Sequence, residues 1–494
     1  MPQPPKTLFG TPISPGVLRK GERMRARFAR KSGYTGTTEY PLCAESNPIL
    51  GPFFGVQNLV SRTGGIPLDY EKGILIGTIR MGYGHYRIAM AAASAAHALG
   101  YTPYWFDLLG FDTAGARMIR DLDKWYSLGS RISQKSKLFN KLLWDPLMGK
   151  WYKRLEKNYP VMAAAEVFSD IYRALPKDMP LLATHPFNAH GAIHAGMTRV
   201  INMIPDNCPL GFHLVDGATQ TVQTPSNYFG FRSLKEMGPK GRVIPGVPAA
   251  QIEMTGHYID HELVTNIEAD CQARLRRIAE KKPRRLLISI GGAGAQQQLV
   301  ADIVKHLLPL VRVGRVTLFV NFGDHEKAWN HLRHHVKGFE DVAQKHVEWA
   351  DTVSFAQQAV SGEVGGLHTF LHRDTFCAVY ATNLLMRASD VLLTKPSELA
   401  YYPLPKLMLE RVGGHEAWGA IRAGELGDGT IECPGTPLAL QALDMLIHED
   451  DLLTLYCENI LKLHQIGIYN GAYKVVELAM QGQGSGGGPL CQDD

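Results

Sequence analysis

The fold of this 494-residue chain is constrained most by two glycine-rich turns, each of which leads from a short apolar strand into a helix. The first lies in "ILIGTIRMGYGHYRIAMAAASAAHALG", where Ile74–Ile76 predicts a buried strand and Arg87–Leu99 a helix with small residues on nearly every face. The second lies in "RRLLISIGGAGAQQQLVADIVKHLLPLV", near the start of the second half. A strand, a glycine turn and a helix near the start of each half predict an α/β protein with two Rossmann-like domains in tandem.

Later apolar runs extend both predicted sheets. In the first half we expect strands at Tyr101–Leu109, in "PLLATHPF" up to a loop at Thr184–Phe187, in "RVINMIPD" up to Asp206, and in "NYFGF", Asn227–Phe231. A long helical stretch, Asp112–Ala174, separates the first of these strands from the others. In the second half, "RVTLFVNFGD" and "ASDVLLTKPSELAYY" each contain a further strand. This alternation predicts doubly wound parallel sheets.

The predicted division of the chain follows from these elements. We expect an irregular basic N-terminal extension over 1–71, a first Rossmann-like domain over 72–255, a second over 256–480 that includes the C-terminal helices, and a flexible tail over 481–494.

Composition excludes several classes of protein. Hydrophobic residues make up 45% and charged residues 20%, as in an ordinary globular protein. No apolar run reaches the roughly 18–20 residues of a membrane span, and the N-terminus lacks the apolar core of a signal peptide. The seven cysteines are scattered without a C-x-x-C pair, which argues against a disulfide framework or a cysteine zinc site. The sequence therefore predicts a protein of the reducing cytoplasm.

Basic charge is concentrated in "VLRKGERMRARFARK", Val17–Lys31, which contains seven Lys and Arg residues and one acidic residue, Glu22. Val17, Met24 and Phe28 would share one stripe of a helix. Such a segment is typical of a helix lying on an anionic membrane surface, and equally of a solvated, partly disordered arm. No recognised nucleic-acid module accompanies the charge, so we expect no nucleic-acid partner.

The first glycine turn has features that favour the binding of an anion. Its backbone N–H groups and the positive end of the following helix suit a phosphate. However, Gly77, Gly82 and Gly84 do not form the dinucleotide fingerprint, and a P-loop lysine is missing. His85, at the mouth of the turn, has the chemistry of a base near neutral pH. The alternative is a tight turn whose histidine is merely solvated.

Several motifs recur in a fixed order over about residues 72–430. They are "GYGHYRIAMAAASA", Thr184–Phe187 ("THPF"), "IPDNCPLGFH" with Asp206 and His213, "TGHYID", "SIGGAGAQQQ", "SDVLLTKPSE" and "GHEAWGA". In this order they resemble GT-B glycosyltransferases of the monogalactosyldiacylglycerol synthase type, which are related to the enzyme that adds N-acetylglucosamine to lipid I in peptidoglycan assembly.

The resemblance implies a GT-B fold with two Rossmann-like domains facing each other across a cleft, and a function. The expected reaction moves a sugar, with inversion, from a nucleotide-diphosphate donor such as a UDP-sugar to the hydroxyl of a lipid or polyprenyl-linked acceptor, as in glycolipid biosynthesis. It implies a hexosyltransferase that needs no cofactor and no metal. The expected location is the cytoplasm, with a peripheral position on the inner face of the membrane as the alternative that the basic segment raises.

The resemblance also assigns residues to roles. Catalysis falls to His85 and Asp206, and the acceptor or phosphate loop to Gly82, Gly84, His185 and His213. The donor would be held by Ser289, Gly291, Gly292 and Gly294 at the diphosphate, Lys395, Ser397 and Glu398 at phosphate or ribose, and His415 and Glu416 at the sugar.

Some positions depart from the family's pattern. Ser397-Glu398 stands in place of a glycine, and His415 and Gly419 stand in place of a glutamine and an asparagine that contact the sugar. These departures keep two further functions open. One is an epimerase or hydrolase resembling the non-hydrolysing UDP-N-acetylglucosamine 2-epimerase, for which Asp206, Asp216 and Glu416 would supply acidic groups. The other is a non-catalytic nucleotide-sugar-binding protein.

One further segment is a candidate for contact with the lipid acceptor. Trp125–Tyr159 mixes aromatic with basic side chains, which suits a boundary with lipid. An ordinary helical pair with its tryptophans in the core is the alternative.

Overall fold

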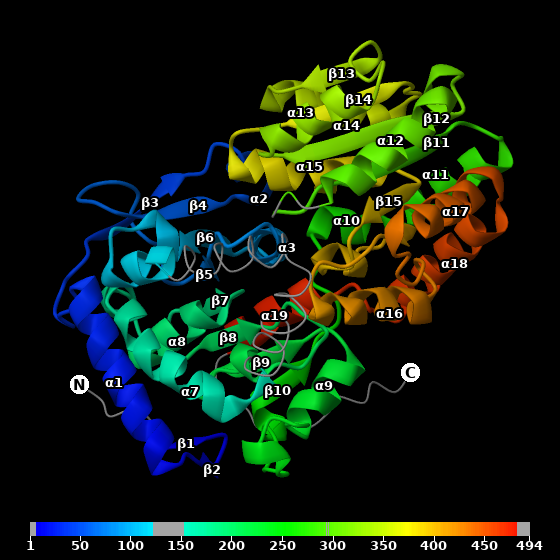
Figure 1. Ribbon diagram of the computed structural model, residues 1–494. Coiled ribbons are helices and arrows are strands. Elements are labelled where there is room, and N and C mark those ends of the chain that lie inside the picture. Colours follow the sequence, from blue (N-terminus) through cyan, green and yellow to red (C-terminus); the bar gives the residue numbers. More distant parts are fainter. Residues whose placement is uncertain (1–5, 122–152, 293, 295, 482–494) are drawn as a thin grey trace, which may run out of the picture.

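The computed structural model describes residues 6–121, 153–292, 294 and 296–481. It contains two α/β domains, each built on a largely parallel sheet (Figure 1). The predicted two-domain Rossmann-like arrangement is confirmed. Within the described ranges, no helix combines the length and the apolar character that crossing a membrane requires.

The first sheet has the strand order β10-β9-β8-β7-β5-β6-β4-β3, and all neighbours are parallel except β3 and β4. From β5 to β8 the strands alternate with helices, because the apolar runs are separated by polar or glycine turns. Its elements are β3 (Leu42–Ser46), β4 (Gln57–Ser61), β5 (Gly73–Thr78), α3 (Gly84–Ala98), β6 (Thr102–Asp107), α7 (Leu155–Ala164), β7 (Leu181–Ala183), α8 (Pro186–His194), β8 (Val200–Met203), β9 (Thr219–Val222), α9 (Pro225–Arg232) and β10 (Ile252–Met254).

The second sheet has the order β13-β14-β12-β11-β15-β16 and is parallel throughout. Its strands are β11 (Arg284–Ser289), β12 (Val316–Gly323), β13 (Ala343–His346), β14 (Leu367–Leu371), β15 (Val391–Thr394) and β16 (Lys406–Met408). The helices around it are α10 (His261–Thr265), α11 (Ile267–Ala279), α12 (Gln297–Arg312), α13 (Glu326–His335), α14 (Trp349–Ser361), α15 (Thr375–Ala388), α16 (Ala417–Leu426), α17 (Gly435–His448) and α18 (Asp451–Gln465).

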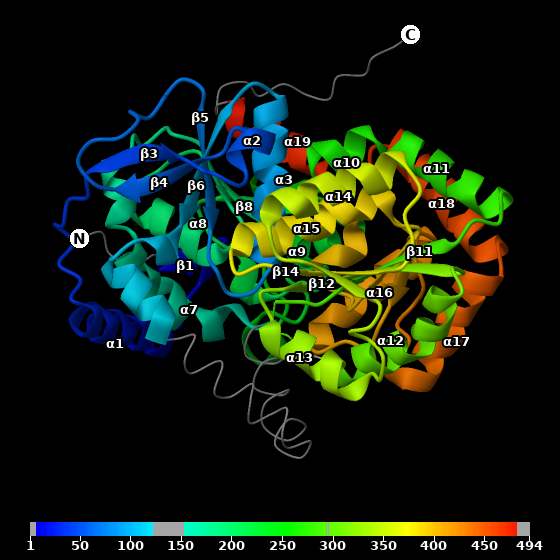
Figure 2. The same ribbon diagram turned by 90° about the horizontal axis from the view of Figure 1, so that it is seen from above.

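The small residues of α3 are explained by its place between the domains. Figure 2 shows α3 with the first sheet on one side and the second domain on the other. It contacts β5, β6, α10 and α15, and all of its residues from Tyr86 to Ala96 are buried. A helix covered on both sides needs short side chains on both, which alanine supplies.

The end of the chain returns to the first domain. Helix α19 (Gly471–Met480) packs on α3, β7 and β8 (Figure 1). The Arg199 guanidinium donates to the Ala479 carbonyl, at 3.1 Å from Nε and 2.5 Å from Nη2. This helix therefore ties the two domains together.

Two sequence predictions were wrong. "NYFGF" forms helix α9 rather than a strand, because Thr224 caps the Asn227 amide at 3.2 Å and Pro225 takes the first helical position. The extension over 1–71 is not irregular, since β4 pairs with β6 and so adds β3 and β4 to the first sheet.

The basic segment is likewise an ordered helix rather than a disordered arm. Helix α1 (Pro15–Ser32) begins with proline at its first position and ends at Gly33, whose φ of 71° suits glycine. Its partly buried Val17, Met24 and Phe28 pack on the first domain, so the stripe does not face solvent. The short strands β1 (Thr7–Leu8) and β2 (Thr11–Pro12) precede it.

Candidate active site between two glycine loops

The first glycine loop connects β5 to α3 and lies against the second domain. Gly82 adopts a φ of 106°, which side chains other than glycine rarely allow. A Cβ on Gly84 would lie 3.0 Å from Glu398 Oε2, which comes from the second domain. The loop needs its glycines both for its own conformation and for the close approach of the other domain.

The second glycine loop connects β11 to α12 and meets the first directly. A Cβ on Gly292 would lie 2.5 Å from the Tyr83 amide nitrogen and 2.9 Å from Gly82 Cα. A Cβ on Gly291 would lie 3.1 Å from Lys395 Cε. In this conformation the contact leaves no room for even a methyl group between the two loops.

Tyr83 connects the first loop to the second domain through hydrogen bonds. Its hydroxyl donates to Asp324 Oδ1 at 2.5 Å and accepts from the Asp324 amide at 2.8 Å. Burial, together with the Asp324 carboxylate, holds the pKa of Tyr83 well above its usual value, so the hydroxyl stays protonated. Gly323 has a φ of 61°, and a Cβ there would lie 2.3 Å from the Tyr83 oxygen. Arg80 also pairs with Asp324, at 3.1 Å.

His85 lies at the start of α3 with its two ring nitrogens in different roles. Nδ1 is 2.6 Å from the Thr184 carbonyl oxygen. Because a carbonyl only accepts, Nδ1 carries the proton and the lone pair is on Nε2. Burial lowers the pKa of His85, and the Thr184 carbonyl, Asp206 and Glu398 offset only part of that effect. The His85 ring is thus partly buried and hydrogen-bonded to the backbone rather than fully solvated.

Two further histidines of the first domain surround His85. The His185 ring lies 4.8 Å from it, edge to face, and His185 Nδ1 accepts from the Phe187 amide at 3.1 Å as the cap of α8. Burial lowers the pKa of His213 to about 4, although Asp206 Oδ2 lies 3.4 Å from its Nε2. Burial also holds the pKa of His185 well below its usual value, and His85 and His213 add to that effect. The cluster is thus neutral near pH 7.

Lys395 of the second domain forms an ion pair with Glu416 Oε1, and it lies close enough to Asp206 to interact with that carboxylate electrostatically. Burial opposes the Lys395 charge, but Glu416 and Glu398 outweigh it and raise the pKa of the ammonium. The other Glu416 oxygen accepts from the Val412 amide at 2.7 Å and the Gly413 amide at 3.1 Å. Both oxygens of Glu416 are therefore engaged within the protein.

The remaining predicted residues lie around this pair. Glu398 Oε1 is 3.9 Å from Nε of the buried Arg87, which belongs to α3. Ser397 turns the chain, with its amide 2.8 Å from the Lys395 carbonyl. Ser289 shares a hydrogen bond of 3.1 Å with Thr382. His415 is exposed and close enough to His213 to disfavour its protonation.

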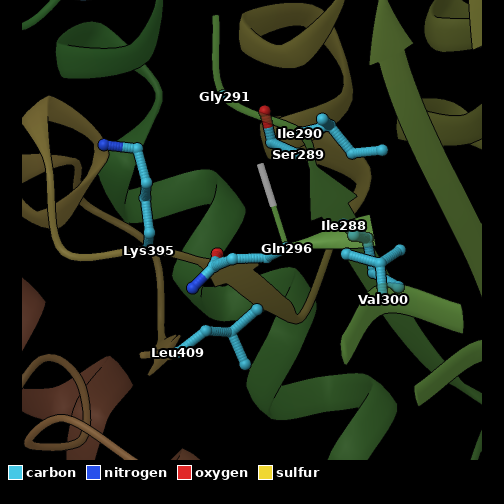
Figure 3. A pocket seen from close by; sticks show the side chains of 8 residues that line it. All are labelled: Ile288, Ser289, Ile290, Gly291, Gln296, Val300, Lys395 and Leu409. Carbon is cyan, nitrogen blue, oxygen red and sulfur yellow. The ribbon is translucent and has the colours of Figure 1, made fainter. Parts of the chain in front are cut away.

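A pocket opens beside the second glycine loop (Figure 3). Its walls come from the end of β11, the start of α12 and the ends of β15 and β16. The N-terminus of a 16-residue helix and a lysine at one pocket suit an anion. The lining residues are Ile288, Ser289, Ile290, Gly291, Gln296, Val300, Lys395 and Leu409.

The structure thus brings the predicted residues of both domains to one junction. It also shows residues there that the motifs did not indicate, namely Tyr83, Arg87, Asp324 and His325. The ring of His325 lies against Gly294, with Nδ1 at 3.1 Å from a Cβ built there, and its Nε2 is buried with no hydrogen-bond partner among the residues that the structure describes. No sequence motif indicates these residues, because each makes its contact at the junction with a residue far away in the sequence.

Across the part of the chain that the structure describes, no three His, Cys, Asp or Glu side chains are grouped so as to hold a metal ion. Most of the predicted acceptor segment Trp125–Tyr159 lies outside the described residues. Of its end, Tyr159 is buried in α7.

Comparisons with solved structures give likenesses at low identity. A structure titled "OtsA apo structure" is 13% identical, with a TM-score of 0.41, over 82% of this chain and 97% of that one. The S. aureus MnaA-UDP co-structure is 11% identical, with a TM-score of 0.39, over 82% of this chain and 94% of that one. UDP-GlcNAc 2-epimerase from Neisseria meningitidis, bound to UDP-GlcNAc, is 11% identical, with a TM-score of 0.34, over 66% and 81%.

No curated protein matches the chain. Two family models do, each over slightly less than half of it. Residues 7–233 match the model described as Domain of unknown function (DUF6937), and residues 247–480 match Domain of unknown function (DUF6938). The first model covers β3 to β9 of the first sheet, and the second covers the whole second sheet together with β10, the remaining strand of the first. Neither description names an activity.

Proposed function

We propose that the protein is a glycosyltransferase that moves a sugar from a nucleotide-diphosphate donor to an acceptor hydroxyl. The observation that carries the proposal is the state of His85. Its Nδ1–H is committed to Thr184, so Nε2 is left as a base, and His85 directly follows the Gly82–Gly84 loop, which meets the second loop at Gly292.

The donor diphosphate would lie at the second glycine loop. Gly291, Gly292 and Gly294 let its oxygens approach the backbone, and the N-terminus of α12 and Lys395 offset their charge. Lys395 must then exchange Glu416 for phosphate, and the two loops must part to admit the donor. Glu398 would accept from the ribose hydroxyls, and His415 would face the sugar.

The proposed reaction needs one proton transfer. The acceptor oxygen attacks the anomeric carbon while the bond from that carbon to the diphosphate oxygen breaks, which inverts the configuration. The acceptor proton passes to His85 Nε2, and the nucleoside diphosphate leaves with both bonding electrons. Lys395 and the helix N-terminus stabilise that leaving group, so the step needs no metal. Asp206 would hold His213 and, through its charge, favour protonation of His85.

We infer further that the acceptor is a lipid or polyprenyl-linked alcohol reached at the cytoplasmic face of a membrane. The support is the resemblance of the motif order in residues 72–430 and the basic helix α1. Donor and acceptor would then meet at the domain junction from opposite sides.

One observation favours a second candidate, an epimerase or hydrolase acting on the nucleotide sugar alone. Asp206 and His213 form a carboxylate–imidazole pair beside His85. Such a group of acids and bases also suits proton abstraction from a sugar carbon.

An assay with a panel of UDP- and GDP-sugars separates these functions. A transferase releases nucleoside diphosphate in proportion to glycosylated lipid only when a diacylglycerol or polyprenyl acceptor is present. An epimerase converts the sugar without any acceptor. Thermal stabilisation by a nucleotide sugar without turnover would identify a binding protein and would contradict both enzyme proposals.

A further inference from the structure

Helix α1 has two faces of different character. Its inner face packs on α7 and on the core of the first domain through Val17, Leu18, Met24 and Phe28. Figure 1 shows α1 along the outer edge of that domain. The side opposite to this packing faces away from the protein.

The helix is fixed in this position by two close contacts. A Cβ on Gly21 would lie 2.8 Å from the Tyr159 ring, so glycine allows α1 to approach α7 closely. Arg25 Nε lies 2.7 Å from Oε2 of Glu166, whose side chain is only 3% exposed. Breaking this ion pair would leave a buried carboxylate unpaired, which is costly. We therefore expect α1 to remain docked rather than to unfold from the surface.

The outer face of α1 is almost uniformly basic. At about 3.6 residues per turn, the spacing of its basic residues other than Arg25 places them on one side of the helix. Their side chains are exposed, whereas Lys31, which borders the same face, pairs with Asp121 at 2.5 Å. The five remaining basic residues of this face are Arg19, Lys20, Arg23, Arg27 and Arg30. None of these five forms an ion pair within the described part of the chain.

We propose that this face docks the protein on a bilayer that contains anionic phospholipid, with α1 lying flat on the headgroups and its apolar side chains still packed on the protein. The charge of the face is complementary to such a surface. The apolar stripe that an inserting amphipathic helix would place among the acyl chains is already occupied by α7 and the core. The attraction is therefore electrostatic.

A nucleic acid is a poorer fit to the same face. Proteins that bind single strands stack bases on aromatic side chains, and proteins that read duplexes combine cations with groups that hydrogen-bond to bases. The outer face of α1 offers only Lys and Arg beside Gly16, Glu22 and Ala26. The inference deepens the proposed membrane-bound acceptor, but its surface lies outside the candidate active site, so a failure of vesicle binding would leave the proposed chemistry at His85 untouched.

Vesicle co-sedimentation of the full-length protein tests the proposal. We expect binding to vesicles of phosphatidylcholine mixed with phosphatidylglycerol at low salt, and no binding to phosphatidylcholine alone. High salt should release the protein, because the Debye length falls from about 10 Å at 0.1 M to about 3 Å at 1 M. The triple variant Arg19→Gln, Arg23→Gln, Arg27→Gln should bind on the order of 100-fold more weakly.

A matched control removes the same charge elsewhere. Lys305→Gln, Lys327→Gln, Lys462→Gln changes three exposed cations on helices of the second domain and should bind as the parent does. Circular dichroism and a thermal melt check that both triple variants are folded. Failure of the parent to bind, equal loss in both variants, or binding to phosphatidylcholine alone would overturn the proposal. Loss of RNA binding without loss of vesicle binding in the α1 variant would overturn it in favour of a nucleic acid.

Discussion

Replacing Tyr83 by phenylalanine tests whether the first glycine loop is held by the second domain. The change removes the hydrogen bond to the Asp324 carboxylate at 2.5 Å and the one from the Asp324 amide at 2.8 Å, and it keeps the ring. A hydrogen bond to a charged group contributes about 1.5–3 kcal/mol and a neutral one about 0.5–1.5 kcal/mol. Arg80 remains beside Asp324, so we expect a loss of about 2–3 kcal/mol in the free energy of unfolding.

The assay is a double-mutant cycle of Tyr83→Phe and Asp324→Asn, measured by urea unfolding with fluorescence and circular dichroism. Residues in direct contact should show a coupling free energy of about 1–2 kcal/mol. Tyr70→Phe, at a tyrosine that is 56% exposed, is the control and should change stability by less than about 0.5 kcal/mol. Additive effects of the two substitutions, or a Tyr83→Phe protein as stable as the parent, would refute the assigned contact.

Three further predictions follow from the same junction. Gly292→Asp should abolish nucleotide-sugar binding in calorimetry, since its side chain would strike the Tyr83 backbone and repel phosphate; unchanged affinity in the folded variant would exclude the loop as the donor site. Glu416→Gln should tighten binding of a nucleoside diphosphate by roughly tenfold, because Lys395 loses its internal counter-ion; weaker binding would mean that Glu416 itself contacts the ligand. Because the pKa of His213 is about 4 in the folded protein, against about 6.5 unfolded, the unfolded chain takes up the proton first as the pH falls. The free energy of unfolding should therefore decrease between about pH 6.5 and pH 4, by about 1.4 kcal/mol per pH unit for this group. His213→Gln should flatten that slope in urea titrations, and an unchanged slope would show that His213 is not the group responsible.

Local patterns predicted much of the fold because both glycine turns follow short, fully buried strands. β5 and β11 were identified from their apolar runs, and the alanines of α3 from their unusual density. Those signals lie within a few residues of the elements that they specify, so no distant contact is needed to interpret them.

The errors had two sources, a local helix-start signal outweighed by composition and a pairing between distant strands. "NYFGF" has the aromatic composition of a strand, but the Thr224 cap and Pro225 start a helix there. β3 and β4 are short, and they are stabilised by pairing with each other and, through β4, with β6, where Asn58 pairs with Trp105, 47 residues further along the chain.

The candidate site was predicted only in part, for the same reason. His85, Lys395 and the glycines belong to recognisable motifs, whereas Tyr83 and Asp324 meet across 241 residues of sequence. The pairing of Glu416 with Lys395 was also missed, because the resemblance assigned that carboxylate to the sugar.

The measurement that tests the central claim most directly is the turnover of His85→Ala with the donor and acceptor identified in the sugar panel. A positioned base typically contributes about 10²–10⁴-fold in rate, so we expect turnover to fall by that factor while donor affinity, set in the second domain, changes little. The parent should also stay active below the usual imidazole pKa, because burial lowers the pKa of His85, and the variant should lose this acid limb. His334→Ala, at an exposed histidine of α13, serves as the control. A folded His85→Ala protein that binds donor and transfers sugar at the parental rate would contradict the account.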